Sequence, residues 1–209
     1  MAKTSGSNRS GGGDNGGFTR GDGTYRGKVE NVRDLATIKN AAVYKEMKEG
    51  ISRYHSVMGV RQRSVKLADL SPRTNGVHMT SLSGESEGIF LNSKVFDRYT
   101  KKELTQRVKR AYDVGWSTRT NKPVQHTITH ELAHATWNNK LSAPNARAAS
   151  PEIVKLHSQW KADKRKSGYG KYSQTNINEF WAEVVTKAVH GKPDKYTRAA
   201  KKIVKRYKL

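Results

Sequence analysis

The spacing of apolar positions changes several times along the chain, and each change predicts a different element. Between Val29 and about Gly59, apolar side chains recur every three or four residues, at positions 32, 35, 38, 42, 43 and 47. This spacing predicts one or two amphipathic helices. From residue 61 to residue 95 the pattern alternates or runs apolar, in the stretches 61–67, 77–80 and 89–95. Turn signals separate these stretches, which predict a small sheet of about three strands.

Helical spacing dominates the rest of the chain. Thr100 followed by Glu103 is a capping-box pattern, and it begins a helix that we expect to end at Gly115. A second helix is expected from near Pro123 to about Trp137. Further helices are expected over residues 151–163, 176–190 and 194–208. The order of elements predicts an α+β fold with a small mixed sheet and a mostly helical C-terminal half.

The start of the chain has a different composition. Residues 1–27 hold nine of the 18 glycines, mixed with Ser, Asn, Thr and Asp. Such a segment buries too little apolar surface to offset the entropy lost on ordering, so we expect a flexible tail. The expected organisation is a tail over 1–27, a helical segment over 28–60, the main domain over 61–191 and a basic amphipathic helix over 192–209.

Charge and composition narrow the class of protein. The chain carries 40 Lys and Arg against 18 Asp and Glu, a formal net charge of +22, which favours a nucleic acid or another polyanion as a partner. Apolar runs are far too short for a membrane span, and the first residues lack the apolar core of a signal peptide, so an intracellular or virion-associated protein is expected. The absence of cysteine excludes disulfides, thiolate metal sites and cysteine nucleophiles.

Positive charge is concentrated in the last expected helix. Its apolar stripe predicts a packed face, and its other face carries Lys195, Arg198, Lys201, Lys202, Lys205 and Arg206. Two interpretations stay open, a solvated helix face and a surface that contacts phosphates or another polyanion, with membrane docking as a weaker third.

The strongest chemical signal is the sequence His130-Glu131-Leu132-Ala133-His134. On a helix, two histidines four residues apart project from one face and can bind the same metal ion. Glu131 then lies where a general base is needed, which is the arrangement of zinc peptidases. The apolar positions 124, 128, 132 and 135 give this stretch the helical stripe that the motif requires.

A catalytic zinc ion needs a third protein ligand. The candidates downstream are His157, Asp163, Glu179 and Glu183, and the two glutamates lie one turn apart on one expected helix. A carboxylate from a second helix is the gluzincin arrangement. Two alternatives remain open. Glu179 would also form a capping pair with Asn176, and His126, one turn before the motif, is a competing ligand.

The segment Tyr172-Ser-Gln-Thr-Asn-Ile-Asn-Glu179-Phe-Trp-Ala-Glu183, downstream of the histidine motif, resembles the zinc metallopeptidase family of anthrax lethal factor and the Pro-Pro endopeptidases. Similar domains occur in phage head-associated proteins. The resemblance covers roughly residues 88–190 and implies a zincin-like fold. It also implies a Zn²⁺ ion bound by His130, His134 and Glu179, with Glu183 behind these ligands. Glu131 would be the general base, and Tyr172 would donate to the developing oxyanion, with Tyr169 as its competitor.

The family usually has Gly where this chain has Ala133, a small residue that suits a helix.

Together, the motif and the resemblance lead us to expect a zinc-dependent endopeptidase acting on a protein or peptide. The stretch from Ile89 to Val95 is the candidate edge strand for binding an extended peptide. The alternative is a basic virion-associated or nucleic-acid-associated structural protein that keeps the metallopeptidase-like fold.

Overall fold

The computed structural model describes residues 27–61, 63–163 and 168–209, so the expected tail lies outside the described residues except for its last position. The strands are β1 (Glu30–Asp34), β2 (Val65–Asp69), β3 (Gly76–Thr80) and β4 (Ser86–Asn92). The α-helices are α1 (Ala41–Met58), α2 (Ser93–Phe96), α3 (Lys101–Asp113), α4 (Pro123–Thr136), α5 (Pro144–Ala162), α6 (Ile177–His190) and α7 (Lys195–Tyr207). Two 3₁₀ helices, η1 (Leu35–Thr37) and η2 (Lys171–Gln174), complete the set. The fold is therefore α+β, as expected.

The expectation of a wholly helical segment over residues 28–60 is wrong for its first part. Residues 30–34 form β1, which pairs antiparallel with β2. Val32, the first member of the expected helical stripe, is 48% exposed, so the apparent periodicity did not mark a buried face. Asp34 then caps η1 and Asn40 caps α1, which is the one α-helix of this segment.

The four described strands form one mixed sheet in the order β1-β2-β4-β3. β4 pairs parallel with β2 and antiparallel with β3, so it lies inside the sheet. The expected edge strand from Ile89 to Val95 is therefore wrong on two counts. Asn92 ends β4 because its side chain accepts from the backbone N–H of Lys94 and caps α2, which contains Val95. The edge strand that packs beside α4 is β3.

The C-terminal helices follow the sequence signals closely, with one difference. Thr100 and Glu103 form the expected capping box of α3, and Pro123 occupies the first turn of α4. The helix expected from Pro151 begins instead at Pro144 and carries Pro151 in its interior. Proline suits the first turn of a helix and costs a hydrogen bond inside one, so both prolines were possible starts.

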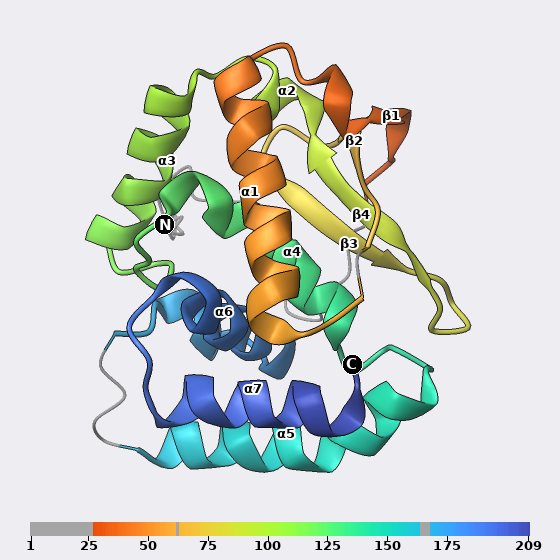
Figure 1. The fold of residues 1–209 in the computed structure, drawn as a ribbon, viewed down its shortest axis with the longest axis vertical. Coiled ribbons are helices and arrows are strands. Elements are labelled where there is room, and N and C mark those ends of the chain that lie inside the picture. The colour runs from red at the N-terminus through yellow and green to blue at the C-terminus, as the bar shows by residue number, and fades with distance from the viewer. Residues whose placement is uncertain (1–26, 62, 164–167) are drawn as a thin grey trace, which may run out of the picture.

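The core lies around α4 and α6. In the view of Figure 1, α4 passes behind α1, and α5 and α7 run side by side below α6. Every residue of α6 from Asn178 to His190 is buried. One apolar cluster extends from Leu35 to Leu209, so the N-terminal segment and the basic C-terminal helix both belong to this core. In the part of the chain that the structure describes, no helix combines the length and apolar character needed to cross a bilayer.

Candidate metal centre

Helix α4 carries the histidine motif and is held by polar side chains of two neighbouring helices. The Tyr54 hydroxyl of α1 donates to the carbonyl oxygen of Leu132 over 3.1 Å. Nearer the start of α4, Oγ1 of Thr129 lies 2.8 Å from Nε2 of His190 on α6. Hydrogen bonds of this kind in a buried setting have strict geometry, so they fix the rotation of α4 and thus the direction of its histidines.

Three side chains meet between α4 and α6. Glu179 Oε2 lies 3.0 Å from His130 Nε2 and 3.3 Å from His134 Nε2, and the two imidazole nitrogens are 3.1 Å apart. Zinc binds imidazole and carboxylate ligands at about 2.0–2.2 Å, which in a tetrahedron places neighbouring ligand atoms about 3.3–3.5 Å apart. The three side chains have the donor types that zinc prefers, and their separations of 3.0–3.3 Å are close to this range, so the group could hold a metal ion after a small outward shift.

The first turn of α6 turns the Glu179 side chain toward the histidines. The side chain of Asn176 accepts from the backbone N–H of Glu179 over 3.0 Å and caps the helix. The capping interpretation of this pair is thus correct for the backbone of Glu179. It does not compete with metal binding, because the carboxylate itself contacts His130 and His134.

Glu183, one turn further along α6, lies on the other side of the His130 ring. Its Oε1 is 3.3 Å from His130 Nδ1 and 3.3 Å from His126 Nε2. Its Oε2 accepts from the backbone N–H of Thr118 over 2.6 Å. His126, His130 and Glu183 thus form a second group of potential ligands. We interpret this group as support for His130, since a metal-binding histidine commonly directs its second nitrogen to a carboxylate.

The electrostatics of the cluster reflect its burial. Burial alone would lower the pKa of His130, but the contacts with Glu179 and Glu183 outweigh it and hold this pKa well above its ordinary value. Burial would raise the pKa of Glu179, but His134 and His130 hold it below its ordinary value. Two buried carboxylates around paired imidazoles are a strongly cation-attracting arrangement.

Glu131 lies beside this cluster and is 8% exposed. Burial raises its pKa, although His130 and His134 act in the opposite direction. Gly76, the first residue of β3, makes room for it, because a Cβ atom at Gly76 would lie 2.9 Å from Cγ of Glu131. A side chain at position 76 would therefore push Glu131 away.

The two candidate tyrosines occupy different places. The Tyr172 ring stacks on the His130 ring with a centroid distance of 5.5 Å and on the Trp116 ring at 5.4 Å. The Tyr169 hydroxyl instead donates to Asp194 over 2.9 Å, at the start of α7. Only Tyr172 lines the cleft beside the histidines.

Backbone hydrogen bonds connect the segment from Gly168 to Tyr172 with the residues that follow α3. The backbone N–H groups of Lys171 and Tyr172 donate to the carbonyl oxygens of Gly115 and Trp116, each over 2.8 Å. Gly170 permits this close contact, because a Cβ atom there would lie 2.2 Å from the Trp116 carbonyl oxygen. Tyr172 is thus positioned by the segment that follows α3.

An open cleft leads to His130 and Glu131. Its walls come from the start of β3, one face of α3, the Trp116-Ser117 segment and α4. Two atoms of lining residues, Oδ1 of Asn75 and Nε of Arg107, are buried without a hydrogen-bond partner in the described residues. An extended peptide offers donors and acceptors that such atoms can use.

Several other candidates are engaged elsewhere. The His157 ring packs on Phe180 with a centroid distance of 4.9 Å, and Asp163 accepts from the Tyr196 hydroxyl over 2.6 Å. Neither belongs to a group of potential metal ligands among the described residues. Among the basic residues, Lys195 pairs with Asp163 and Arg206 pairs with Glu152.

Comparison of the chain with protein-family models, with curated proteins and with solved structures gives no match.

Proposed function

We propose that this protein is a zinc-dependent endopeptidase of the gluzincin type. The observation that carries the proposal is the meeting of Glu179 from α6 with both His130 and His134 of α4, at distances of 3.0 and 3.3 Å. Two imidazoles and one carboxylate are a ligand set of catalytic zinc, which leaves the fourth position for water or substrate. The resemblance of the two motifs to lethal factor-like peptidases supports the same assignment.

Zinc bound by His130, His134 and Glu179 would supply a Lewis acid and lower the pKa of a water molecule toward neutrality. Glu131 would accept the proton of the attacking water and pass it to the leaving amine. Its buried position suits both steps, because burial raises its pKa toward the working range of a general base that becomes an acid.

Tyr172 would donate a hydrogen bond to the oxygen on which negative charge develops. Stacking on His130 and Trp116 limits the rotation of its ring, so the hydroxyl keeps its direction during the reaction. Glu183 would hold the orientation of His130 through Nδ1.

The substrate would be an extended peptide added to the exposed edge of β3. Gly76 at the start of this strand lies against Glu131, so a peptide paired with β3 passes beside the proposed general base. Asn75 and Arg107, which line the same cleft, would bind the peptide further.

The alternative function is a basic virion-associated or nucleic-acid-associated structural protein with a metallopeptidase-like fold. The specific observation that favours an enzyme is Glu131, because a zinc site with a purely structural role needs no buried carboxylate next to its ligands.

The test is metal analysis and cleavage of a peptide library by the wild-type protein and by Glu131→Gln. The proposal expects one zinc ion in both proteins and cleavage by the wild type only. Glu87→Gln, at an exposed position on β4, is the matched control and should cleave normally. Absence of zinc, or equal cleavage by Glu131→Gln, would overturn the proposal, and zinc without cleavage in the wild type would favour the structural alternative.

A further inference from the structure

A second groove lies between the C-terminal end of α1 and the C-terminal half of α7, outside the cleft that contains the histidine motif. It is an open groove of about 1500 Å³, lined by residues 56–61, 63, 145, 201, 204, 205, 208 and 209. Five of the lining residues are cations, namely Arg61, Arg63, Lys201, Lys205 and Lys208, and no lining residue is Asp or Glu. We call this feature the basic groove.

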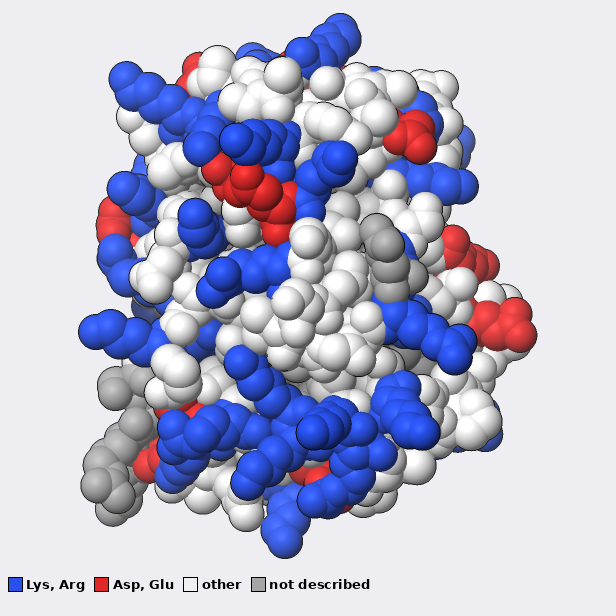
Figure 2. Space-filling model, viewed as in Figure 1, with Lys and Arg blue, Asp and Glu red and all other residues white. Residues whose placement is uncertain are grey.

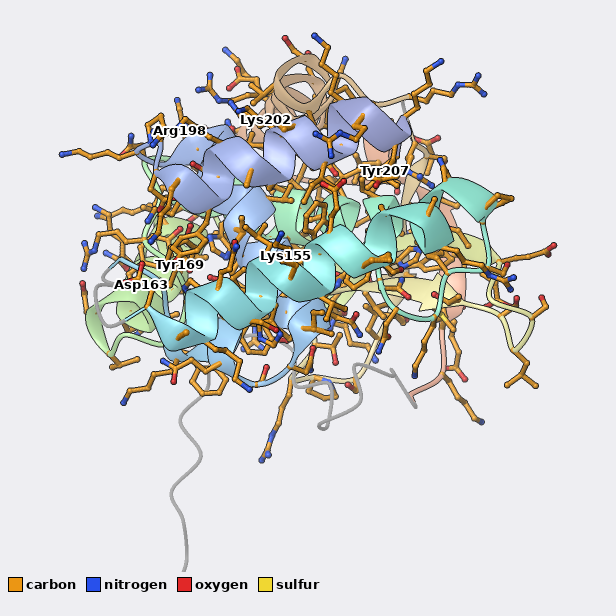
Figure 3. All side chains as sticks on the ribbon, turned by 90° about the horizontal axis from the view of Figure 1, so that it is seen from below. Lys155, Asp163, Tyr169, Arg198, Lys202 and Tyr207 are labelled. Atoms are coloured by element: carbon orange, nitrogen blue, oxygen red, sulfur yellow. The ribbon has the colours of Figure 1, made fainter. Side chains whose placement is uncertain are left out.

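The surface around the basic groove is also positive. Figure 2 shows Lys and Arg side chains gathered over α7 in the lower half of this face, with few acidic side chains between them. Arg198 and Lys202 project from the side of α7 that faces away from α5 (Figure 3). Lys195 and Arg206, in contrast, are paired with Asp163 and Glu152. The positive charge of α7 available to an anion therefore comes from its other cations.

Arg63 provides a separate indication that the basic groove takes an anion. Its backbone N–H donates to Nε2 of His55 on α1 over 3.4 Å, which ties this part of the chain to the helix. The side chain is half-buried and has no carboxylate partner among the described residues. Burial lowers the pKa of Arg63, as expected for a cation that has lost part of its hydration. A bound anion would replace the favourable interaction with water that the Arg63 guanidinium loses on burial.

Three lysines follow one another along the groove at the C-terminal end of α7. Lys201 and Lys205 are four residues apart on α7, which corresponds to about 6 Å along the axis, and Lys208 follows as the C-cap residue in the left-handed conformation. A row with this spacing fits a repeating anion better than one isolated phosphate, and nucleic acid presents such a repeat along its backbone.

We propose that the basic groove binds the phosphate backbone of double-stranded DNA without sequence preference. A membrane surface is a poorer partner, because an amphipathic helix must insert its apolar face, and the apolar residues of α7 are buried in the core. An acidic protein is also a poorer partner, because the described residues that line the groove include no aromatic side chain to serve as an anchor. The same lack of aromatic residues disfavours single strands, whose bases stack on such side chains.

The test is fluorescence anisotropy with a labelled DNA duplex of mixed sequence, at salt concentrations between 50 and 200 mM, on the full-length protein. The test variant is Lys201→Gln/Lys205→Gln/Lys208→Gln, which keeps the side-chain stems. The control variant is Lys66→Gln/Lys102→Gln/Lys109→Gln, at exposed positions on β2 and α3. Both variants lose the same net charge, so any difference in DNA affinity between them reflects where on the surface the charge is lost.

We expect the test variant to bind about tenfold or more weakly, with the slope of log affinity against log salt reduced by about 2.7, or about 0.9 for each lost phosphate contact. The control variant should change the slope by less than one. Arg61→Gln/Arg63→Gln should reproduce the loss from the other wall of the groove. Equal losses in the test and control variants would overturn the proposal, as would unchanged binding in both groove variants.

Two further arms of the test measure binding to vesicles that contain phosphatidylserine and, separately, binding to a poly-glutamate peptide. Binding to either that exceeds binding to DNA at the same charge concentration, and that the groove variants abolish, would replace DNA by that partner. DNA binding does not depend on zinc or on Glu131, so failure of the peptidase proposal would leave this result unaffected.

Discussion

The imidazole of His130 lies between two carboxylates, with Oε1 of Glu183 at 3.3 Å from its Nδ1. Nε2 of the same ring faces Glu179, so each nitrogen of one histidine contacts a different glutamate of α6. The two glutamates are four residues apart and thus share one face of the helix. Their different positions around the ring predict different effects when each is changed.

Glu179→Gln should weaken zinc binding more than Glu183→Gln does. The first change replaces a proposed ligand, whereas the second removes the carboxylate proposed to orient His130 and should cost about 10–100-fold in affinity. Competition with a chelator of known affinity measures the zinc affinity of each variant. Glu87→Gln again provides the control, and a larger loss with Glu183→Gln would show that the ligand is Glu183.

Gly76→Ala should abolish most cleavage while leaving zinc bound. The new methyl group would lie 2.9 Å from Cγ of Glu131, so the proposed general base must move away from its position. Cleavage rate and zinc content report the two effects separately. Gly59→Ala is a suitable control, since its methyl group would meet nothing within 4 Å and would cost stability only through the positive φ of 69°. Normal cleavage by Gly76→Ala would argue against Glu131 as the base.

Tyr172→Phe and Tyr169→Phe should separate turnover from stability. Loss of the Tyr172 hydroxyl should lower kcat by about 10²–10³-fold, the usual effect of removing one oxyanion donor. Loss of the Tyr169 hydroxyl removes a hydrogen bond to Asp194 and should lower the free energy of unfolding by about 1.5–3 kcal/mol. Steady-state kinetics and urea unfolding distinguish the two, and the opposite pattern would exchange their roles.

Asp194→Asn should destabilise the protein in a pH-dependent way. Burial alone would raise the pKa of Asp194, but hydrogen bonds from Lys187, Thr197 and Tyr169 hold it below its ordinary value of 3.8. Stability from the ionised group is therefore complete above this ordinary value and is lost as the pH falls through the lowered one. At pH 7 the variant should be less stable by about 1–2 kcal/mol, because it loses the ion pair with Lys187 and the charged acceptor for Tyr169, while Asn can still cap α7.

Urea unfolding of the wild type and Asp194→Asn between pH 7 and pH 3 should show this difference shrinking at the acid end. Asp113→Asn is the matched control, since Asp113 is exposed and its pair with Arg119 contributes little. A difference that stays constant with pH would mean that the charge of Asp194 does not stabilise the fold.

Sequence signals located the helices that carry the site. The capping pattern at Thr100, the proline at Pro123 and the cap at Asn176 all act locally, so they fixed the starts of α3, α4 and α6 without knowledge of the rest of the fold. The positions of Glu179 and the two histidines follow from these helices once α4 and α6 pack together.

Other parts of the molecule depend on long-range contacts that a sequence does not display. Strand β4 lies inside the sheet because it pairs with β2 and β3 at once, and nothing in its own residues distinguishes that from an edge. Gly76 and Gly170 matter because of what lies opposite them, Glu131 and the Trp116 carbonyl group. A glycine next to a turn is an ordinary feature of any sequence, so neither was recognisable in advance.

The ion pairs of α7 show the same limitation. Six basic residues of this helix looked equivalent along the chain, and only folding brings Asp163 to Lys195 and Glu152 to Arg206. Arg61 and Arg63, about 140 positions earlier, join the basic groove because α1 ends beside α7.

The separation of the proposed ligands along the chain has a thermodynamic consequence. His130 and Glu179 are 49 positions apart and belong to the two helices at the centre of the core. An ion held between them would act as a cross-link that the unfolded chain cannot keep. Free zinc at a hundred times its dissociation constant would then add about 2.7 kcal/mol to the free energy of unfolding. The melting temperature of this protein should therefore serve as a gauge of the zinc concentration around it.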